Sequence, residues 1–407
     1  MEPIKVDPTT ELTTLVNELN NASKAFNPAP GPSGTQSRIE IIAKAKQIIN
    51  AMRDPLTISF AHGASMLETM AIRTLVSLHV FEKIPGDGSI TLEALSQATG
   101  VQDSLLERLL RILVVTGFVN QTPEFEYTHT KFSRAYATSP EIGKFFALKY
   151  DDVFLVLDRF HEYLADRKSL KEPEDPAFNP FTWAHKQDGT NVWEIMAQNP
   201  ARLKEYQIGL ATADKRMPTV GFYDFGRLNT SDSRPVFVDV GGGSGVSILA
   251  IMKAHPELAK TPEKFILQDL KGPIELAREA GKLPEGVKTM EHDFYSEQPV
   301  KGAKAYYIRR IMHDYSDANC VLILKRLAEA MSADSVVLIS DMVIPPQCSE
   351  TNLMAVMSDL AIMSMGGKER TEAGFSKILG LAGLELVKVW KANVEGDALA
   401  EARLATK

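Results

Sequence analysis

Four of the five residues from Gly241 to Gly245 are glycine, and they directly follow the apolar run VFVDV. The next stretch, SGVSILAIMKAH, has apolar residues at helical spacing, so the glycines lie between a predicted strand and a predicted helix. Such a loop lets a ligand approach the backbone at the positive end of the helix. The pattern therefore predicts that Gly241 and Gly243 contact a nucleotide-like or nucleoside-like cofactor. The loop lacks the P-loop lysine and the full GxGxxG of a dinucleotide fold, so a tight turn in an unliganded sheet is the alternative.

Two acidic residues follow at the ends of the next two predicted strands. Asp269 closes KFILQD, where a carboxylate can accept both hydroxyl groups of a ribose. Asp293, followed by Phe294, closes VKTMEHDF, where an acid and an aromatic ring can flank an adenine. Each acid alone could equally be a solvated strand end or a helix cap. In register with the glycine loop, the two acids favour S-adenosylmethionine (SAM) over NAD.

A histidine, His313, follows the fourth predicted strand, AKAYYIRRIM, beside the presumed cofactor. Asp341 ends the fifth strand, VVLISD, and Glu369 lies in the loop-like GGKERT. Two carboxylates from separate segments could flank one imidazole, fix its tautomer and stabilise the imidazolium. A phenol with a pKa of about 10 is mostly protonated at pH 7, so its attack on a methylsulfonium needs such a base. A purely structural histidine is the alternative.

We expect no metal in this chemistry, because the sequence has no evident metal-ligand cluster. Asp314 and Asp317 are interpreted instead as caps of the helix DANCVLILKRLAEAM.

The elements that position these residues are strand-like runs separated by amphipathic helices. They begin at Pro235 and comprise VFVDV, KFILQDL, VKTMEHDF, AKAYYIRRIM, SVVLISDM and LELVKVWKA. This alternation predicts an α/β fold with a mostly parallel, doubly wound sheet that binds ligands at the carboxyl ends of its strands.

The N-terminal part has a different pattern. A helix, a turn at Gly100, a second helix and two short β-like runs around Thr122 and Pro123 indicate a winged-helix arrangement. Its second helix, DSLLERLLRILVV, is too apolar for a polar groove, which favours packing against another chain. A regulatory DNA-binding module with a vestigial cofactor fold is the alternative, and the net charge of −7 counts against it and against nucleic acid as a partner.

Composition narrows the class of protein further. The chain has 407 residues with 44% hydrophobic and 24% charged residues, near the globular average. Its two cysteines predict neither a disulfide framework nor a structural zinc site. There is no apolar run long enough for a membrane span and no secretion signal at the start, so we expect a soluble, cytoplasmic protein with no membrane partner.

The motifs VDVGGGSG, QDL, EHDF, RRIMHDYSD, SDMVIP and GGKERT, in this order, resemble the SAM-dependent O-methyltransferases of the caffeic-acid type, in the version common in fungal secondary metabolism. The resemblance implies a class I, Rossmann-like methyltransferase domain and an N-terminal, mainly α, winged-helix-like dimerisation domain, and hence a homodimer. It implies His313 as the base, with Asp341 and Glu369 flanking it. The cofactor contacts that it implies are Gly241, Gly243, Asp269, Asp293, Phe294 and Arg309, although plant members usually have lysine where Arg309 stands.

The substrate is expected to be a small aromatic or polyketide-like metabolite with a phenolic or enolic hydroxyl. Tyr206 and Leu210, before the glycine strand, and Met357 and Met363, in NLMAVMSDLAIMSMGG, are candidate pocket residues. Methionines can adapt to a flat ring system, or they can simply fill a core. A fungal relative that uses bound SAM for pericyclic or dehydration chemistry is the alternative to a methyltransferase.

The sequence predicts four parts. They are an arm over 1–37, read as mobile or as an N-terminal helix on a linker, a dimerisation domain over 38–140, a helical connector with substrate-pocket helices over 141–215, and a SAM-binding catalytic domain over 216–407.

Overall fold

The computed structural model describes residues 8–29, 31–200, 202, 217–392 and 395–406. The chain divides into two compact units. The helical unit comprises Met1–Asn17, Ala45–His161 and Trp193–Arg216, and the sheet unit comprises Glu18–Lys44, Glu162–Val192 and Met217–Lys407. Among the described residues, no helix combines the length and the apolar character that crossing a membrane requires.

The sequence is compatible with either a mobile arm or an N-terminal helix on a linker over residues 1–37, and the described residues of this stretch contain two helices. Helix α1 spans Pro8–Lys24 and helix α2 spans Pro32–Met52, so α2 begins before the expected start at Arg38. Proline is well suited to the first position of a helix because its fixed φ is helical and its missing N–H would have no partner there.

The helical unit contains the predicted helix, turn, helix and hairpin. Its elements are α3 (Ile58–Ser77), α4 (Leu92–Thr99), α5 (Asp103–Val115), β1 (Val119–Gln121), β2 (Tyr127–His129), α6 (Lys131–Thr138), α7 (Pro140–Lys149) and α8 (Leu155–Asp158). Gly100 ends α4 with a φ of 70°, and Val119 pairs with His129 in the antiparallel hairpin. Leu106, Leu110 and Leu113 of α5 are fully buried, which explains why this helix is so apolar. Three short helices follow: α9 (Phe160–Arg167), α10 (Pro180–Ala184) and α11 (Val192–Ala197).

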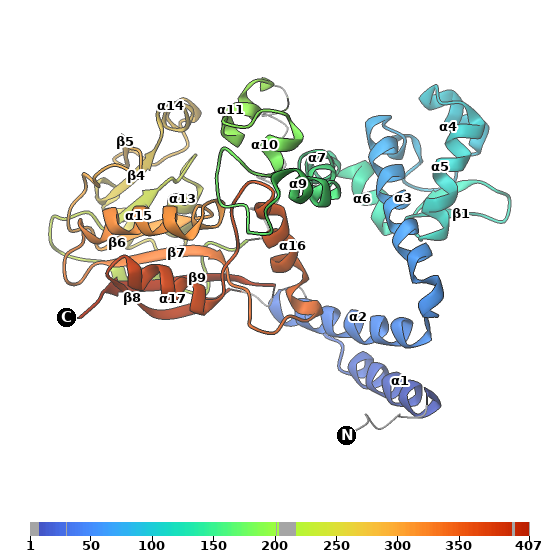
Figure 1. Ribbon diagram of the computed structural model, residues 1–407, viewed down its shortest axis with the longest axis horizontal. Helices are drawn as coiled ribbons and strands as arrows, with labels where there is room; N and C mark the ends of the chain where they lie inside the picture. Colours follow the sequence, from blue (N-terminus) through green and yellow to red (C-terminus); the bar gives the residue numbers. More distant parts are fainter. Residues whose placement is uncertain (1–7, 30, 201, 203–216, 393–394, 407) are drawn as a thin grey trace. The chain divides into compact units, whose positions relative to one another are not determined.

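The sheet unit is built on seven strands in the order β5-β4-β3-β6-β7-β9-β8. The strands are β3 (Phe237–Val240), β4 (Phe265–Asp269), β5 (Lys288–Glu291), β6 (Ala305–Arg309), β7 (Val336–Met342), β8 (Leu384–Lys391) and β9 (Asp397–Leu404). The pairs among β3 to β7 are parallel, and β9 is antiparallel to both β7 and β8. Figure 1 labels these elements along the chain.

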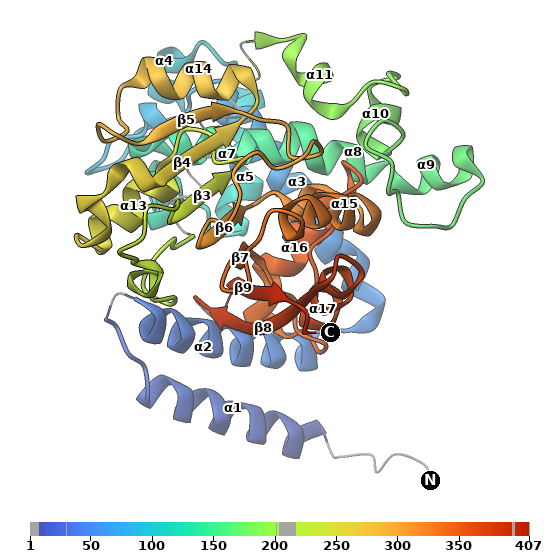
Figure 2. The ribbon, with the colours of Figure 1, turned by 90° about the vertical axis from the view of Figure 1, so that its left-hand side faces the viewer.

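Helices cover both faces of this sheet. They are α13 (Val246–Ala254), α14 (Lys271–Ala280), α15 (Asp317–Ala328) and α17 (Glu372–Leu381). Helix α16 (Leu353–Met363) lies between β7 and α17 in the chain. Buried residues of α15 and α17 form one core with Val238 and Tyr306, whereas those of α13 and α14 form a second core with Phe237 and Tyr307. Figure 2 shows α13 and α15 on opposite sides of the strands. Successive strand residues thus point to opposite faces, and the sheet is doubly wound as predicted.

Strand β9 is the strand of this sheet that the sequence does not predict. Its residues DALAEARL include Ala398, Ala400 and Ala402, all buried. Alanine is depleted in strands, so local propensity does not indicate one here. The strand forms because β7 and β8 both pair with it.

Candidate active site

The glycine loop connects β3 to α13 at the carboxyl edge of the sheet. Gly241, Gly243 and Gly245 have φ of 71°, 55° and 77°, a region that favours glycine. A Cβ at Gly242 would lie 2.4 Å from the Asp239 side chain, whereas a Cβ at Gly243 would meet nothing within 4 Å. The chain's own packing therefore excludes a side chain at Gly242, whereas the space beside Gly243 is open.

Asp269, at the end of β4, is bonded to this loop. One carboxylate oxygen accepts the Gly243 N–H at 2.8 Å and the other accepts the Leu270 N–H at 2.7 Å. Burial raises the pKa of Asp269, and these two hydrogen bonds oppose that rise. Each oxygen has a further lone pair, so the carboxylate can still accept bonds from a ligand.

Asp293 and Phe294 lie just beyond β5. The Asp293 carboxylate accepts the N–H of Tyr295 at 3.0 Å. The Phe294 ring would be 3.8 Å from a Cβ at Gly241, so it lies against the first glycine of the loop. The predicted aromatic residue and the glycine loop are thus brought together.

Asp239 is a further candidate for the cofactor site, beyond the residues predicted from the sequence. Its side chain is fully buried beneath Gly242, and neither carboxylate oxygen has a hydrogen-bond partner among the described residues. Burial raises the pKa of Asp239 to about 7, against the opposing charge of Arg309. A lone acid in the otherwise apolar VFVDV was the signal that could have identified it.

One set of groups at this edge of the sheet fits a cationic nucleoside cofactor. It consists of the Asp239 and Asp269 carboxylates, the open space beside Gly243 and the Phe294 ring. The orphaned carboxylate favours a positive charge, and the second carboxylate and the ring suit a ribose and a base. Arg309, at the end of β6, donates from Nη2 to the Met217 carbonyl at 3.1 Å.

His313 lies in the short turn η7 (Met312–Asp314) after β6 and is 6% exposed. Its Nδ1 is 2.8 Å from Oε1 of Glu369, and its Nε2 is 3.5 Å from Oδ1 of Asp314. Asp341, at the end of β7, is also buried, and neither of its carboxylate oxygens has a hydrogen-bond partner among the described residues. His313, Asp341 and Glu369 line one small cavity of about 20 Å³, so the fold brings the three predicted residues together.

The carboxylates around His313 set its charge. Burial alone would lower the pKa of His313, but Glu369, Asp314 and Asp341 outweigh burial and raise it to about 9. Burial likewise favours the neutral form of Glu369, yet the contact with His313 holds its pKa below the ordinary value. For Asp341 burial dominates and raises the pKa to about 7.

The GGKERT loop brings Glu369 to His313 because it lies directly on the histidine backbone. A Cβ at Gly367 would be only 2.1 Å from the His313 carbonyl oxygen, and the Lys368 N–H donates to that oxygen at 2.8 Å. Ser358, on α16, donates its hydroxyl to Oε1 of Glu369 at 2.7 Å.

The interpretation of Asp314 and Asp317 as helix caps is wrong. The N-cap of α15 is Ser316, whose hydroxyl accepts the Asn319 N–H. Asp317 is the first helical residue and pairs with Arg370 at 3.0 Å, while Asp314 faces Nε2 of His313. Serine and aspartate cap equally well, so the sequence SD does not say which residue takes the N-cap position.

The candidate substrate residues are only partly placed. Tyr206 and Leu210 lie outside the described residues. On α16, Met357 is exposed, whereas Met363 lines a cavity of about 190 Å³ that Glu369 also lines.

Comparisons with known proteins match both parts of the chain. Residues 162–385 match the O-methyltransferase domain, and residues 60–139 match the O-methyltransferase dimerisation domain. The O-methyltransferase kntB of Aspergillus niger is 31% identical over 383 residues, covering 92% of this chain and 90% of the relative. The O-methyltransferase hmp5 of Hypomyces subiculosus is also 31% identical, covering 90% and 92% of the two chains.

The chain belongs to the O-methyltransferase family. It is a SAM-dependent O-methyltransferase of the fungal class I type, as the motifs predict. The solved structure of OxaC resembles this methyltransferase with a TM-score of 0.85 and 28% identity, over 98% of this chain and 100% of OxaC. The LepI complex with SAM, at 22% identity and a TM-score of 0.80, shows the shared fold alone.

Proposed function

We propose that this methyltransferase transfers the methyl group of SAM to a phenolic or enolic hydroxyl of a small secondary metabolite, with His313 as the general base. The observation that carries the proposal is the buried His313, held at Nδ1 by Glu369 and lining a cavity with Asp341. The methyltransferase family membership supplies the reaction class.

The hydrogen bond to Glu369 decides which nitrogen of His313 acts. Because Nδ1 donates to the Glu369 carboxylate, the neutral imidazole keeps its lone pair on Nε2. Nε2 then accepts the hydroxyl proton of the acceptor substrate as its oxygen becomes nucleophilic. The carboxylates of Glu369 and Asp341 stabilise the imidazolium that results.

SAM, when bound, supplies a methyl group made electrophilic by a positively charged sulfonium. We assign the cofactor contacts to the backbone of Gly241 and Gly243 and to the side chains of Asp269, Asp293, Phe294 and Arg309. Asp239 adds a buried carboxyl group beneath the loop, with no hydrogen-bond partner among the described residues.

The acceptor substrate is assigned by class only. OxaC has been solved with sinefungin and meleagrin, and with S-adenosylhomocysteine (SAH) and oxaline, at 29–30% identity to this chain, which supports a small-molecule acceptor. We propose Tyr206, Leu210, Met357 and Met363 as pocket residues. A pericyclase-like activity with SAM as a bound, unconsumed group is the weaker candidate, because its structural support comes from relatives of 22–23% identity.

The experiment that tests the proposed function is mass spectrometry of the purified protein with methyl-labelled SAM and a panel of phenolic and polyketide extracts. We expect a labelled product and an equal amount of SAH. An unlabelled metabolite that rearranges or loses water while SAM persists would instead support the pericyclase-like activity.

The rate of methyl transfer is expected to rise with pH, because protonated His313 cannot accept another proton. At a fixed saturating SAM concentration, kcat/KM for the acceptor should rise about tenfold per pH unit below the midpoint. The midpoint should lie above the ordinary histidine pKa of 6.5 and no higher than about 9, the pKa of His313. A flat profile between pH 6 and 9 would argue against a histidine base.

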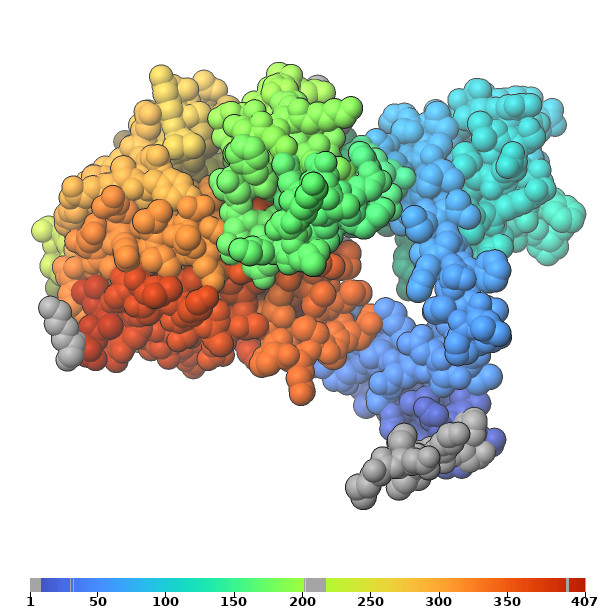
Figure 3. All heavy atoms as spheres, viewed as in Figure 1, coloured from blue at the N-terminus to red at the C-terminus, as the bar shows by residue number. Residues whose placement is uncertain are grey.

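We also propose the four-part organisation predicted from the sequence, with the homodimer formed through residues 38–140 and a cytoplasmic location. The match to the dimerisation domain over 60–139 lies inside that part. The apolar side chains of Phe60, Met66 and Leu67 on α3 are 76%, 62% and 54% exposed (α3 is among the blue atoms at the right of Figure 3), which supports a partner surface there.

Placing charges on this surface of α3 should disrupt the dimer. The double variant Phe60→Lys, Met66→Lys is expected to weaken association by about tenfold or more per residue, because burying an unpaired ammonium costs more than losing an apolar contact. Analytical ultracentrifugation at micromolar concentration should show a dimer for the natural protein and more monomer for the variant. Leu170→Lys, at a site 92% exposed in the sheet unit, is the matched control. A natural protein that sediments as a stable monomer would rule out the dimer.

A further inference from the structure

Arg370 directly follows Glu369 and is nearly fully buried, with 3% exposure. A buried guanidinium is tolerated only where its N–H groups are bonded. Its contacts are Nη1 to the Met312 carbonyl at 2.7 Å and to the Lys368 carbonyl at 3.3 Å, Nη2 to the Tyr315 carbonyl at 2.7 Å, and Nε to Oδ1 of Asp317 at 3.0 Å.

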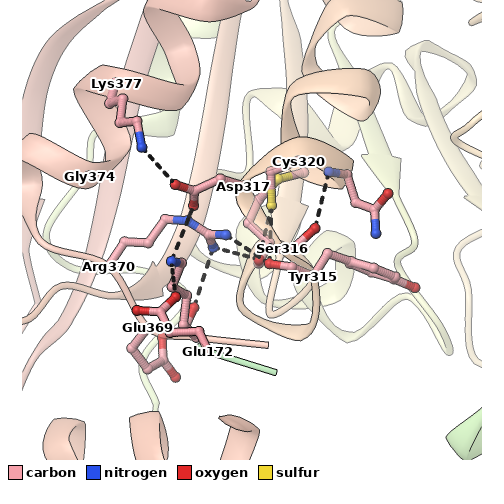
Figure 4. A network of polar contacts seen from close by, with 12 residues as sticks. Glu172, Tyr315, Ser316, Asp317, Cys320, Glu369, Arg370, Gly374 and Lys377 are labelled. Atoms are coloured by element: carbon pink, nitrogen blue, oxygen red, sulfur yellow. Dashed lines mark hydrogen bonds and ion pairs between the residues drawn. The ribbon is translucent and has the colours of Figure 1, made fainter. Parts of the chain in front are cut away.

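These partners belong to the two segments that carry the acid–base pair. Met312 and Tyr315 lie on either side of His313, and Asp317 begins the helix that follows. Lys368 belongs to the loop that carries Glu369. Figure 4 shows the side chain of Arg370 directed at the segment from Tyr315 to Asp317. One guanidinium is therefore bonded to both segments at once.

We propose that Arg370 is a positioning residue that holds the Glu369 carboxylate against His313. The proposal rests on the proposed function for its catalytic meaning, but the geometry that it describes can be measured without turnover. Because Arg370 contacts carbonyls next to His313, it acts through the placement of the His313 turn and the Glu369 loop.

The planar shape of the guanidinium is what this role requires. Arginine presents its donors in a fixed fork, so Arg370 can reach two carbonyls of the His313 segment and one carboxylate in one orientation. Lysine would keep the positive charge but offer a single ammonium, which cannot reproduce that fork. Arg370→Lys therefore separates the geometric role from the charge.

The effect should appear in the titration of His313. Glu369 faces this histidine at Nδ1 and Asp314 faces it at Nε2. The other charged groups that line the shared cavity are Asp341, Asp397, Arg309 and Arg310. If Arg370→Lys lets Glu369 move away, the imidazolium loses its nearest carboxylate and the pKa of His313 falls.

The experiment is an NMR pH titration of the full chain with ¹³C-labelled histidine. The His313 signal is assigned by its absence in His313→Gln. In Arg370→Lys we expect the midpoint to fall by about 1 pH unit or more, the range for loss of a neighbouring opposite charge. SAM affinity by calorimetry should stay within about twofold, since a folded cofactor site holds a separate set of residues. Arg326→Lys, at an exposed arginine of α15 that bonds to Tyr295 and Glu329, is the matched control and should leave the midpoint unchanged.

Two results would overturn the proposal. One is a folded, SAM-binding Arg370→Lys protein whose His313 midpoint equals that of the natural protein. If Arg370→Lys does not fold, Asp317→Asn tests the proposal instead, because it removes the counter-ion of Arg370 and should lower the His313 midpoint by a smaller amount. An unchanged midpoint in Asp317→Asn would overturn the proposal. A lower His313 midpoint in Arg370→Lys, together with full turnover in His313→Gln, would support the positioning role and contradict only the assignment of His313 as the base.

Discussion

Replacing His313 by alanine is expected to lower turnover by roughly 10²–10⁴-fold, the usual contribution of a general base. SAM affinity should hardly change, because His313 contacts Glu369 and not the glycine loop. The neutral acceptor hydroxyl would remain in place, but its proton would have no acceptor at Nε2. Single-turnover SAH release and calorimetric titration of SAM measure the two quantities separately.

The matched control is His255→Ala, at a histidine of the sheet unit that pairs with Glu257. It should leave both turnover and SAM affinity unchanged. The turnover of Glu369→Gln should lie between those of His313→Ala and His255→Ala, since the amide can still accept from Nδ1 but no longer stabilises the imidazolium. Loss of SAM binding together with turnover in His313→Ala would mean that the histidine is structural.

Asp269→Ala should have the largest effect on the cofactor. The ribose hydroxyls would lose their acceptor, and a hydrogen bond to a charged group contributes about 1.5–3 kcal/mol, or roughly 10–150-fold in the dissociation constant. The substitution also frees the Gly243 N–H, which Asp269 accepts at 2.8 Å, so the loop itself should loosen. Calorimetric titration with SAM and with SAH checks the prediction.

Glu279→Ala, at an exposed acid near the end of α14, is the control for a general change in charge. It should bind SAM as the natural protein does. If Asp269→Ala binds SAM with unchanged affinity, the carboxylate only ties the loop to β4 and the ribose is held elsewhere.

The sheet is largely predictable because buried parallel strands carry a strong local signal. Runs such as VFVDV and KFILQDL are mostly apolar, and each is followed by a helix of different periodicity. β9 is not predictable in this way. Its small residues fit the sheet only because neighbouring strands on both sides require a partner.

The residues of the candidate site likewise include some that the sequence indicates and some that it does not. His313, Asp341 and Glu369 can be proposed from their positions at strand ends and in a loop, since parallel strands bring their carboxyl ends together. The role of Arg370 cannot, because it depends on which carbonyls and side chains lie nearby in space. Asp239 can be noticed as a lone acid in an apolar run, but its lack of a hydrogen-bond partner among the described residues appears only in the structure. Asp314 shows the opposite error, since its sequence position fits a cap and its surroundings do not.

The absence of a side chain at Gly367 constrains how this loop can change in length. Within four residues, Gly367 lies on the His313 carbonyl, Lys368 donates to it, Glu369 reaches the imidazole and Arg370 holds the adjacent turn. Inserting one residue between Gly366 and Arg370 would shift every later contact off its partner. The stretch Pro345–Ser349, by contrast, is a mostly exposed connection before α16 and can absorb insertions or deletions. Natural variation in the spacing between Asp341 and Glu369 should therefore collect in that connection and spare the GGKER segment.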